Sequence, residues 1–151
     1  MKIIGIGDLV LDIYMNESEI KGITGGMSFA NVIYNITRLL KDYNNSYNIN
    51  NKDKEIDFET IIYGVCGNDI SGDIIIKELQ SVNINTSYIT RKDNKKTREF
   101  YMYLDENDNF LTSKKKNYIT KKESWYGSSL LKGDIPEELL SKDNIYVFRE
   151  C

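Results

Sequence analysis

The feature that most constrains the fold is an alternation of short apolar segments with segments of helical periodicity. The order is strand, helix, strand, helix, strand, at residues 2–7, 28–43, 58–66, 70–82 and 87–90. The strand segments are short and rich in β-branched residues, and in the helices the apolar residues recur every three or four positions. Alternation of this kind implies a parallel sheet with right-handed crossovers, so the expected fold class is α/β.

Both helices have a predicted buried stripe and a predicted cap. In the first, Ser28 is the expected N-cap, and the stripe consists of Phe29, Val32, Ile33, Ile36, Leu40 and Tyr43. In the second, the stripe consists of Ile75, Leu79 and Val82. Asp69 is more simply interpreted as its cap than as a ligand contact, with Gly67 and Gly72 allowing tight packing.

The remaining segments differ from this pattern. Residues 12–23 suit an exposed extended segment, and 44–57 a polar loop or insertion. Residues 97–104, a turn at 105–109 and 110–112 predict an antiparallel hairpin, which would be a lid, an edge decoration or an oligomer contact.

The last part of the chain predicts less regular structure. Residues 114–124 form a basic connector. Trp125-Tyr126 could stack on a ligand, but a packed aromatic anchor is the preferred interpretation. Pro136 suits the first position of a helical turn at 135–140, and residues 144–148 predict a buried strand. Because no crossover follows that strand, we expect a fold that is cut off part-way.

Composition excludes several kinds of site. The 151 residues include no histidine, which excludes Ser-His-Asp and Cys-His nucleophilic sites. The two cysteines support neither a disulfide framework nor a zinc site, and Cys66 is expected to be a small buried hydrophobe. The net charge of -3 does not by itself indicate nucleic acid or a membrane surface. The basic residues of 91–122 could form a solvated loop or a surface that faces phosphate, and the solvated loop is the preferred interpretation.

Targeting signals are also absent from the sequence. Residues 2–7 lack the flanking features of a signal peptide, and no apolar run approaches the roughly 20 residues that span a bilayer. We therefore expect a cytoplasmic protein with neither nucleic acid nor a membrane as partner.

The candidate site lies around the glycine pair that precedes the first helix. Gly25 and Gly26 allow close backbone approach to a ligand, and first-turn N–H groups are free to donate. Asp8 and Asp12 lie at and beyond the end of the first strand, at the sheet edge where open α/β folds bind ligands. With Asn31, they suit the hydroxyls of a sugar or polyol.

Three alternatives are weaker. Metal binding by Asp8 and Asp12 would need further oxygen ligands from nearby sequence. Asn35 and Arg38 fit a solvated helix face as well as a ligand contact. A dinucleotide site is disfavoured because Gly5-Ile6-Gly7 lacks a third glycine and a following helix, and no P-loop motif occurs.

Taken together, these stretches resemble the N-terminal half of the ribokinase-like (PfkB) carbohydrate kinases. Residues 4–12 (IGIGDLVLD) are similar to the family's first strand, with Asp12 at the position of its sugar-binding aspartate. Residues 25–31 (GGMSFAN) are similar to the Gly-Gly and Asn signature at the first helix, although the spacing from Gly26 to Asn31 is one residue longer than the common pattern.

The resemblance continues along most of residues 1–112. Residues 63–72 (YGVCGNDISG) and the IIIKELQSVNINTSYI that follows are similar to the family's strand, Gly-x-Asp-x-x-Gly turn, helix and short strand. Residue 97 onward matches the segment that builds part of the lid. The Gly-Ala-Gly-Asp motif that supplies the family's anion hole and catalytic base does not occur here.

The resemblance implies a ribokinase-like three-layer fold with a mostly parallel sheet. A small β lid would come from about 13–24 and 97–113, and the nucleotide-binding half would be absent. It also implies ATP- and Mg²⁺-dependent phosphoryl transfer to a sugar or polyol hydroxyl, with this chain supplying sugar recognition and no catalytic residue.

Two other hypotheses stay open: a non-catalytic sugar-binding or interaction module, and a Rossmann-like nucleotide-binding protein. A homodimer through the lid is permitted by Phe100, Tyr101 and Tyr103, which we expect to be exposed.

Overall fold

The computed structural model describes residues 1–26, 28–47, 55–107, 109 and 135–148, and its strands form two sheets. Sheet A has the strand order β5-β4-β1-β7, and every pairing in it is parallel. These strands are β5 (Ile89–Lys92), β4 (Glu59–Gly67), β1 (Lys2–Asp8) and β7 (Ile145–Phe148). The parallel sheet predicted from the alternation is confirmed.

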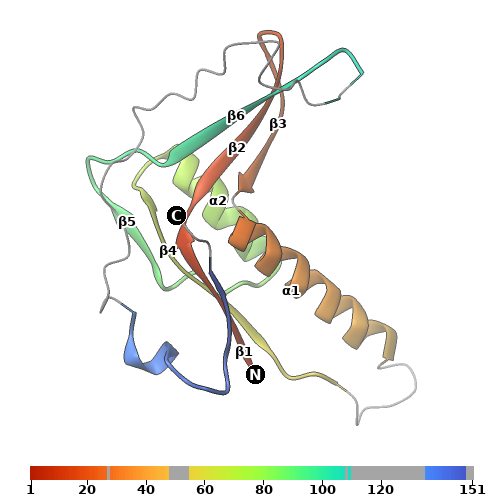
Figure 1. Cartoon of the computed structure of the whole chain (residues 1–151), viewed down its shortest axis with the longest axis vertical. Helices are drawn as coiled ribbons and strands as arrows, with labels where there is room; N and C mark the ends of the chain where they lie inside the picture. The colour runs from red at the N-terminus through yellow and green to blue at the C-terminus, as the bar shows by residue number, and fades with distance from the viewer. Residues whose placement is uncertain (27, 48–54, 108, 110–134, 149–151) are drawn as a thin grey trace.

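Sheet B lies beyond the end of sheet A at which β1 stops (Figure 1). Its order is β3-β2-β6, with β3 (Glu19–Gly26), β2 (Val10–Asn16) and β6 (Arg98–Leu104). β2 pairs with β3 antiparallel and with β6 parallel. The exposed extended segment predicted at 12–23 is therefore two paired strands. The prediction that this segment is exposed was wrong for Ile13, which is only 5% exposed because it faces the hydrophobic core.

The hairpin predicted after residue 97 is described only in part. The turn is present, since the Asp105 N–H donates to the Asn109 carbonyl at 2.9 Å. Residues 110–112, the predicted second strand, lie outside the described residues. The described partner of β6 is β2, distant in sequence, and local turn signals give no indication of that pairing.

Two helices cover one face of sheet A. α1 (Ser28–Tyr47) lies against β1 and β4, while α2 (Ile70–Ser81) lies against β4 and also against β2 and β3 of sheet B. Their apolar side chains join those of both sheets in the main core, which includes Phe29, Ile33, Ile75, Leu79, Leu11 and Ile62.

Glycines in β1 allow α1 to lie directly on the sheet. A Cβ at Gly5 would stand 2.7 Å from Ile33 Cγ1, and one at Gly7 would stand 2.8 Å from Phe29 Cε1. Both distances are shorter than van der Waals contact permits. The Gly5-Ile6-Gly7 segment therefore has a packing role, which explains its likeness to the start of a dinucleotide motif.

The first helix differs from its prediction in three respects. It extends to Tyr47, so residues 44–47 of the predicted polar loop are helical, and its first residue is Ser28, which was predicted to precede it. Val32 was predicted to be buried but is 42% exposed. Thr37 is buried in the helix instead. Its hydroxyl donates to the Ile33 carbonyl at 2.7 Å and contacts the Thr60 hydroxyl at 3.0 Å. Because that polar group is satisfied internally, it can replace an apolar one.

Within the described ranges, the opposite face of sheet A is covered by one short segment. The 3-10 turn η2 (Glu137–Leu139) places Leu139 in a second core with Ile4, Ile6, Ile61 and Tyr63. The helical turn predicted at 135–140 is confirmed in this shorter form. β7 was predicted to be a buried strand, but Phe148 in it is 63% exposed because β7 is the last strand on its side of the described sheet.

Among the described residues, no helix is long and apolar enough to cross a membrane. Residues 114–126, including Trp125-Tyr126, lie outside the described part of the chain.

Candidate functional site

Asp8 and Asp12 lie where the two sheets join. Asp8 is the last residue of β1, and the chain passes through Leu9 into β2, which contains Asp12. Both side chains are half-buried, and both interact with neighbouring groups. Burial raises the pKa of the nearby Tyr14 hydroxyl, and the charges of Asp12 and Glu78 raise it further. The carboxylate of Asp12 is therefore close enough to the Tyr14 hydroxyl to raise its pKa.

The pairing of sheet B brings the predicted glycines to Asp12. In β3, Thr24 pairs with Asp12, and Gly25 and Gly26 pair with the two residues before it. The helix α1 begins two residues after Gly26. The segment that contains the glycine pair therefore lies on the strand next to Asp12.

The structure gives Gly25 a different role from the predicted one. Its N–H donates to the Glu78 carboxylate, so this donor is occupied by the protein. A Cβ at position 25 would lie 3.1 Å from Glu78 Oε2 and 3.4 Å from Ile75 Cγ2. The absence of a side chain at Gly25 therefore permits close packing on α2, and close approach to a ligand remains a prediction for Gly26.

Asn31 lies in the first turn of α1 and is exposed, as Asn35 and Arg38 are further along the same helix. An exposed amide near the glycine pair is accessible to a ligand. Its contact with a sugar stays a prediction.

The neighbours of Asp12 on its face of sheet B were not predicted as part of a site. Thr24, Asp12 and Phe100 are cross-strand neighbours on adjacent strands and so share a face of the sheet. On the same face, Tyr14 pairs with Met102. This face combines a carboxylate and a hydroxyl with aromatic and apolar groups. The sequence signal was only the period-two pattern of β6, which cannot be connected to Asp12 without the β2–β6 pairing.

Of the three aromatic residues expected to be exposed in β6, only Phe100 is, at 42%. Tyr101 and Tyr103 are half-buried, because they alternate onto the face that α2 covers. The Tyr101 hydroxyl donates to Glu99 at 2.8 Å, and this hydrogen bond, together with burial, raises the pKa of Tyr101.

The predicted cap at Asp69 is confirmed. Its carboxylate accepts from the Gly72 N–H at 2.9 Å, from the Thr97 N–H at 2.8 Å and from the Thr97 hydroxyl at 2.6 Å. Burial raises the pKa of Asp69, but these hydrogen bonds outweigh burial and hold the pKa below its ordinary value. Tight packing at Gly67 is also confirmed, since a Cβ there would lie 2.4 Å from the Lys95 carbonyl oxygen.

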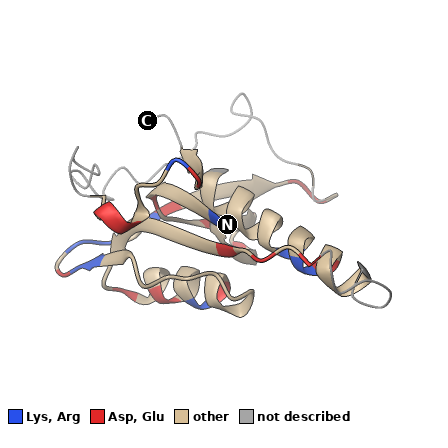
Figure 2. Ribbon diagram, turned by 90° about the horizontal axis from the view of Figure 1, so that it is seen from below, with Lys and Arg blue, Asp and Glu red and all other residues tan. Residues whose placement is uncertain are grey.

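Basic residues gather on the connection from β5 to β6 (Figure 2). Residues 91–96 are all exposed, so this part of the basic segment is solvated, as predicted. Arg91 forms an ion pair with Asp73 at 2.7 Å. Lysines 114–116, 121 and 122 lie outside the described residues.

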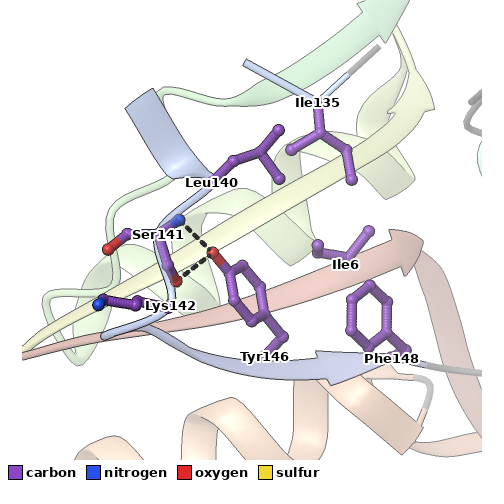
Figure 3. A pocket seen from close by; sticks show the side chains of 7 residues that line it. All are labelled: Ile6, Ile135, Leu140, Ser141, Lys142, Tyr146 and Phe148. Atoms are coloured by element: carbon purple, nitrogen blue, oxygen red, sulfur yellow. Dashed lines mark hydrogen bonds between the residues drawn. The ribbon is translucent and has the colours of Figure 1, made fainter. Parts of the chain in front are cut away.

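An apolar cavity of about 370 Å³ lies on the other face of sheet A (Figure 3). It is lined by Ile6, Ile135, Leu140, Ser141, Lys142, Tyr146 and Phe148. The Tyr146 hydroxyl forms hydrogen bonds at the end of η2. It donates to the Leu139 carbonyl at 2.6 Å and accepts from the Ser141 N–H at 2.7 Å. No residue predicted for the sugar site lines this cavity.

The described residues do not form a magnesium site. No group of three His, Cys, Asp or Glu side chains gathers anywhere in the described ranges, and hard cations need several oxygen ligands. We therefore assign no step of phosphoryl transfer to a metal ion held by these residues.

Comparison with solved structures identifies the fold. A sugar kinase from Pyrococcus horikoshii, solved in complex with ATP, matches 72% of this chain with 22% identity and a TM-score of 0.52. A fructokinase from Halothermothrix orenii matches 74% with 18% identity and a TM-score of 0.52. A nucleoside kinase from Methanocaldococcus jannaschii, an archaeal member of the ribokinase family, matches 73% with 17% identity and a TM-score of 0.50.

The matched part is about a third of those proteins, namely 33%, 37% and 35% of the three chains. No protein-family profile and no curated protein sequence matches this chain. The predicted fold class is thus confirmed: the chain has the ribokinase-like fold over a portion of its length.

Proposed function

We propose that this chain is the sugar-recognising N-terminal portion of a ribokinase-like carbohydrate kinase. The whole protein would transfer a phosphoryl group from ATP to a hydroxyl of a sugar or polyol. The observation that carries the proposal is the β2–β3 pairing, which brings Asp12 and Thr24 together beside Gly25-Gly26 at the start of α1. The activities of proteins that share this fold, a fructokinase and a nucleoside kinase among them, support it.

The side chains around Asp12 suit a polyhydroxylated ligand. A carboxylate accepts hydrogen bonds from two neighbouring hydroxyls, and charge-assisted hydrogen bonds of this kind are stronger than neutral ones. The hydroxyl of Thr24, whose proton is directed to Glu78, can accept a hydrogen bond, and the amide of Asn31 can donate or accept one. Phe100, on the same face as Asp12, offers an aromatic surface to the apolar side of a sugar ring. Asp8 is assigned to the same site because it ends the strand that leads into β2.

The contribution of this chain to catalysis is binding and orientation. Holding the sugar in a fixed position lowers the entropic part of the barrier to transfer. Sheet B would act as a lid that covers the sugar and limits the access of water to the reacting groups. ATP would supply the transferred phosphoryl group, and the resemblance to the kinases implies that the catalytic base belongs to the part of the fold that this chain lacks.

A non-catalytic sugar-binding module is the second candidate. The chain spans about a third of the solved kinases that it matches, so the activity of the whole protein is part of the proposal. Both candidates require sugar binding, and they differ in whether phosphorylation accompanies it in the complete protein.

The test is isothermal titration of the chain with an aldopentose, a ketohexose, a polyol and a nucleoside in turn. We expect one of these to bind with a measurable dissociation constant. Replacing Asp12 by Ala should weaken that binding, because the hydrogen bonds of an ionised partner contribute about 1.5–3 kcal/mol. Replacing the exposed Asp143 by Ala, far along the chain in the segment before β7, is the matched control and should have no effect. Absence of binding by all four ligands, or equal binding by the Asp12 variant, would count against the proposal.

A further inference from the structure

One side chain of α2, that of Glu78, forms hydrogen bonds to the end of β3, which contains the glycine pair. Glu78 extends from the second half of α2 to the end of β3, where its carboxylate accepts from the Gly25 N–H and, at 3.1 Å, from the Thr24 hydroxyl. In the described part of the chain, Glu78 forms no ion pair, so its hydrogen-bond donors are these two neutral groups.

Both of these donors are adjacent to the candidate site. Thr24 is the cross-strand partner of Asp12, and Gly25 precedes Gly26, which ends β3 at the start of α1. Fixing the N–H of Gly25 fixes the plane of the Thr24–Gly25 peptide unit, since each peptide unit is planar. The Glu78 carboxylate therefore holds the end of β3 in one orientation.

The packing around Gly25 gives this contact little freedom. A Cβ at position 25 would lie 3.1 Å from Glu78 Oε2 and 3.4 Å from Ile75 Cγ2, so any larger residue would displace the Glu78 carboxylate. Without the carboxylate, the same two glycine residues would form a flexible segment, because glycine loses more conformational freedom on ordering than any other residue.

We propose that Glu78 is a positioning residue for sugar binding, acting through Thr24 and Gly25 on the orientation of Asp12 and the Gly25-Gly26 segment. This inference rests on the proposed function. Glu78 is not placed in contact with the sugar. Its role is to hold the backbone of the binding segment in one conformation before the ligand arrives, which removes an ordering cost from the binding free energy.

The experiment compares Glu78→Ala and Glu78→Gln with the wild-type chain by two measurements. The first is the amide hydrogen-exchange rate of Gly25 in the absence of ligand, and the second is the dissociation constant of the sugar that binds the wild type. For Glu78→Ala we expect exchange at Gly25 to be about tenfold faster or more and sugar binding to be about tenfold weaker or more, from the loss of a charge-assisted hydrogen bond. Gln retains an oxygen acceptor for Gly25, so it should restore most of both losses.

The control separates positioning from general stability. Ser71→Ala removes another hydrogen bond between α2 and sheet B, from Ser71 Oγ to Glu99 Oε1 at 2.7 Å, at the far end of the helix from Glu78. It should lower the urea midpoint of unfolding but leave the sugar dissociation constant within about twofold of the wild type.

The outcomes are distinct. Unchanged exchange at Gly25 in Glu78→Ala overturns the proposal whether or not a sugar binds. Faster exchange with unchanged sugar affinity, or an equal loss of affinity in Ser71→Ala, also overturns it. If the wild type binds no sugar while Gly25 exchange is accelerated in Glu78→Ala, the proposed function fails, although the fixing of the glycine segment by Glu78 stands.

Discussion

Replacing Asp69 by Ala should destabilise the chain more than any other change of a single carboxylate that we consider. The Asp69 carboxylate accepts from Gly72 and makes two hydrogen bonds with Thr97, which is only 1% exposed. The Thr97 hydroxyl in turn accepts from the Gly67 N–H at 3.0 Å, so its own proton is directed to Asp69. In the variant, the N–H and the hydroxyl of Thr97 would lose their partner without gaining access to water.

The magnitude follows from these contacts. Loss of an N-cap costs about 1 kcal/mol, and each of the two buried donors of Thr97 left without a partner costs about 1–3 kcal/mol, so we expect a loss of about 3–7 kcal/mol in the free energy of unfolding. Asp69→Asn keeps one oxygen acceptor and should lose about half as much. Changes of this size are a large fraction of the total stability of a domain.

The effect should depend on pH with a definite sign. Burial raises the pKa of Asp69, but the hydrogen bonds from Thr97 and Gly72 outweigh it and hold the pKa below the ordinary value of 3.8. A carboxylate whose pKa is lower in the folded than in the unfolded state stabilises the fold above the unfolded pKa. That contribution is lost as the pH falls through the folded pKa. The advantage of the wild type over Asp69→Asn should therefore be full near neutral pH and decrease in acid below the ordinary value.

Urea unfolding followed by circular dichroism measures these differences by linear extrapolation. Asp93→Ala is the matched control, because Asp93 is exposed on the connection from β5 to β6 that also contains Thr97, and it accepts one hydrogen bond from Asn68 at 2.7 Å. We expect the control to change stability by about 0.5 kcal/mol or less, as exposed substitutions usually do. A loss for Asp69→Ala no larger than that of the control would refute the reasoning.

Three further predictions follow from single contacts. Gly5→Ala should destabilise the chain by about 1–3 kcal/mol because its Cβ would lie 2.7 Å from Ile33 Cγ1, whereas Gly22→Ala, with its nearest atom at 3.7 Å, should be neutral in the same urea assay. Burial raises the pKa of the Cys66 thiol to about 11, so mass spectrometry should find Cys66 unalkylated in the folded chain near neutral pH and alkylated in urea; equal labelling in both would contradict this. For the complete protein, the proposed function predicts that Asp12→Ala raises the KM for sugar far more than that for ATP, and an unchanged sugar KM would remove Asp12 from the site.

The fold could be predicted where the signal was local. The periodicity of α2 and the apolar segments of β1 and β4 are properties of neighbouring residues, and their positions were found to within two residues. The pairing of β2 with β6 joins residues that are far apart in the sequence, so no local pattern could reveal it. The exposure of Val32 and the burial of Thr37 were missed for a related reason, since the Thr37 hydroxyl depends on a partner in β4.

In the candidate site, too, local features could be predicted and contacts that depend on tertiary packing could not. Asp12 and the glycine pair were recognisable from residue type, spacing and resemblance, and the β2–β3 hairpin is short enough to bring them together. The contact between Glu78 and Gly25 was not predictable, because Glu78 occupies an ordinary polar position of an amphipathic helix. Its function depends on how α2 lies against sheet B, which is decided by tertiary packing.

The central claim, that sugar is recognised at the junction of the two sheets, is tested most directly by nuclear magnetic resonance. The backbone amide shifts of the chain would be recorded during titration with the sugar that binds it. We predict that the largest changes occur at Asp12, Gly25, Gly26 and Asn31, with smaller changes at Phe100. Changes centred instead on Tyr146 and Phe148, which line the apolar cavity on the other face of sheet A, would contradict the account.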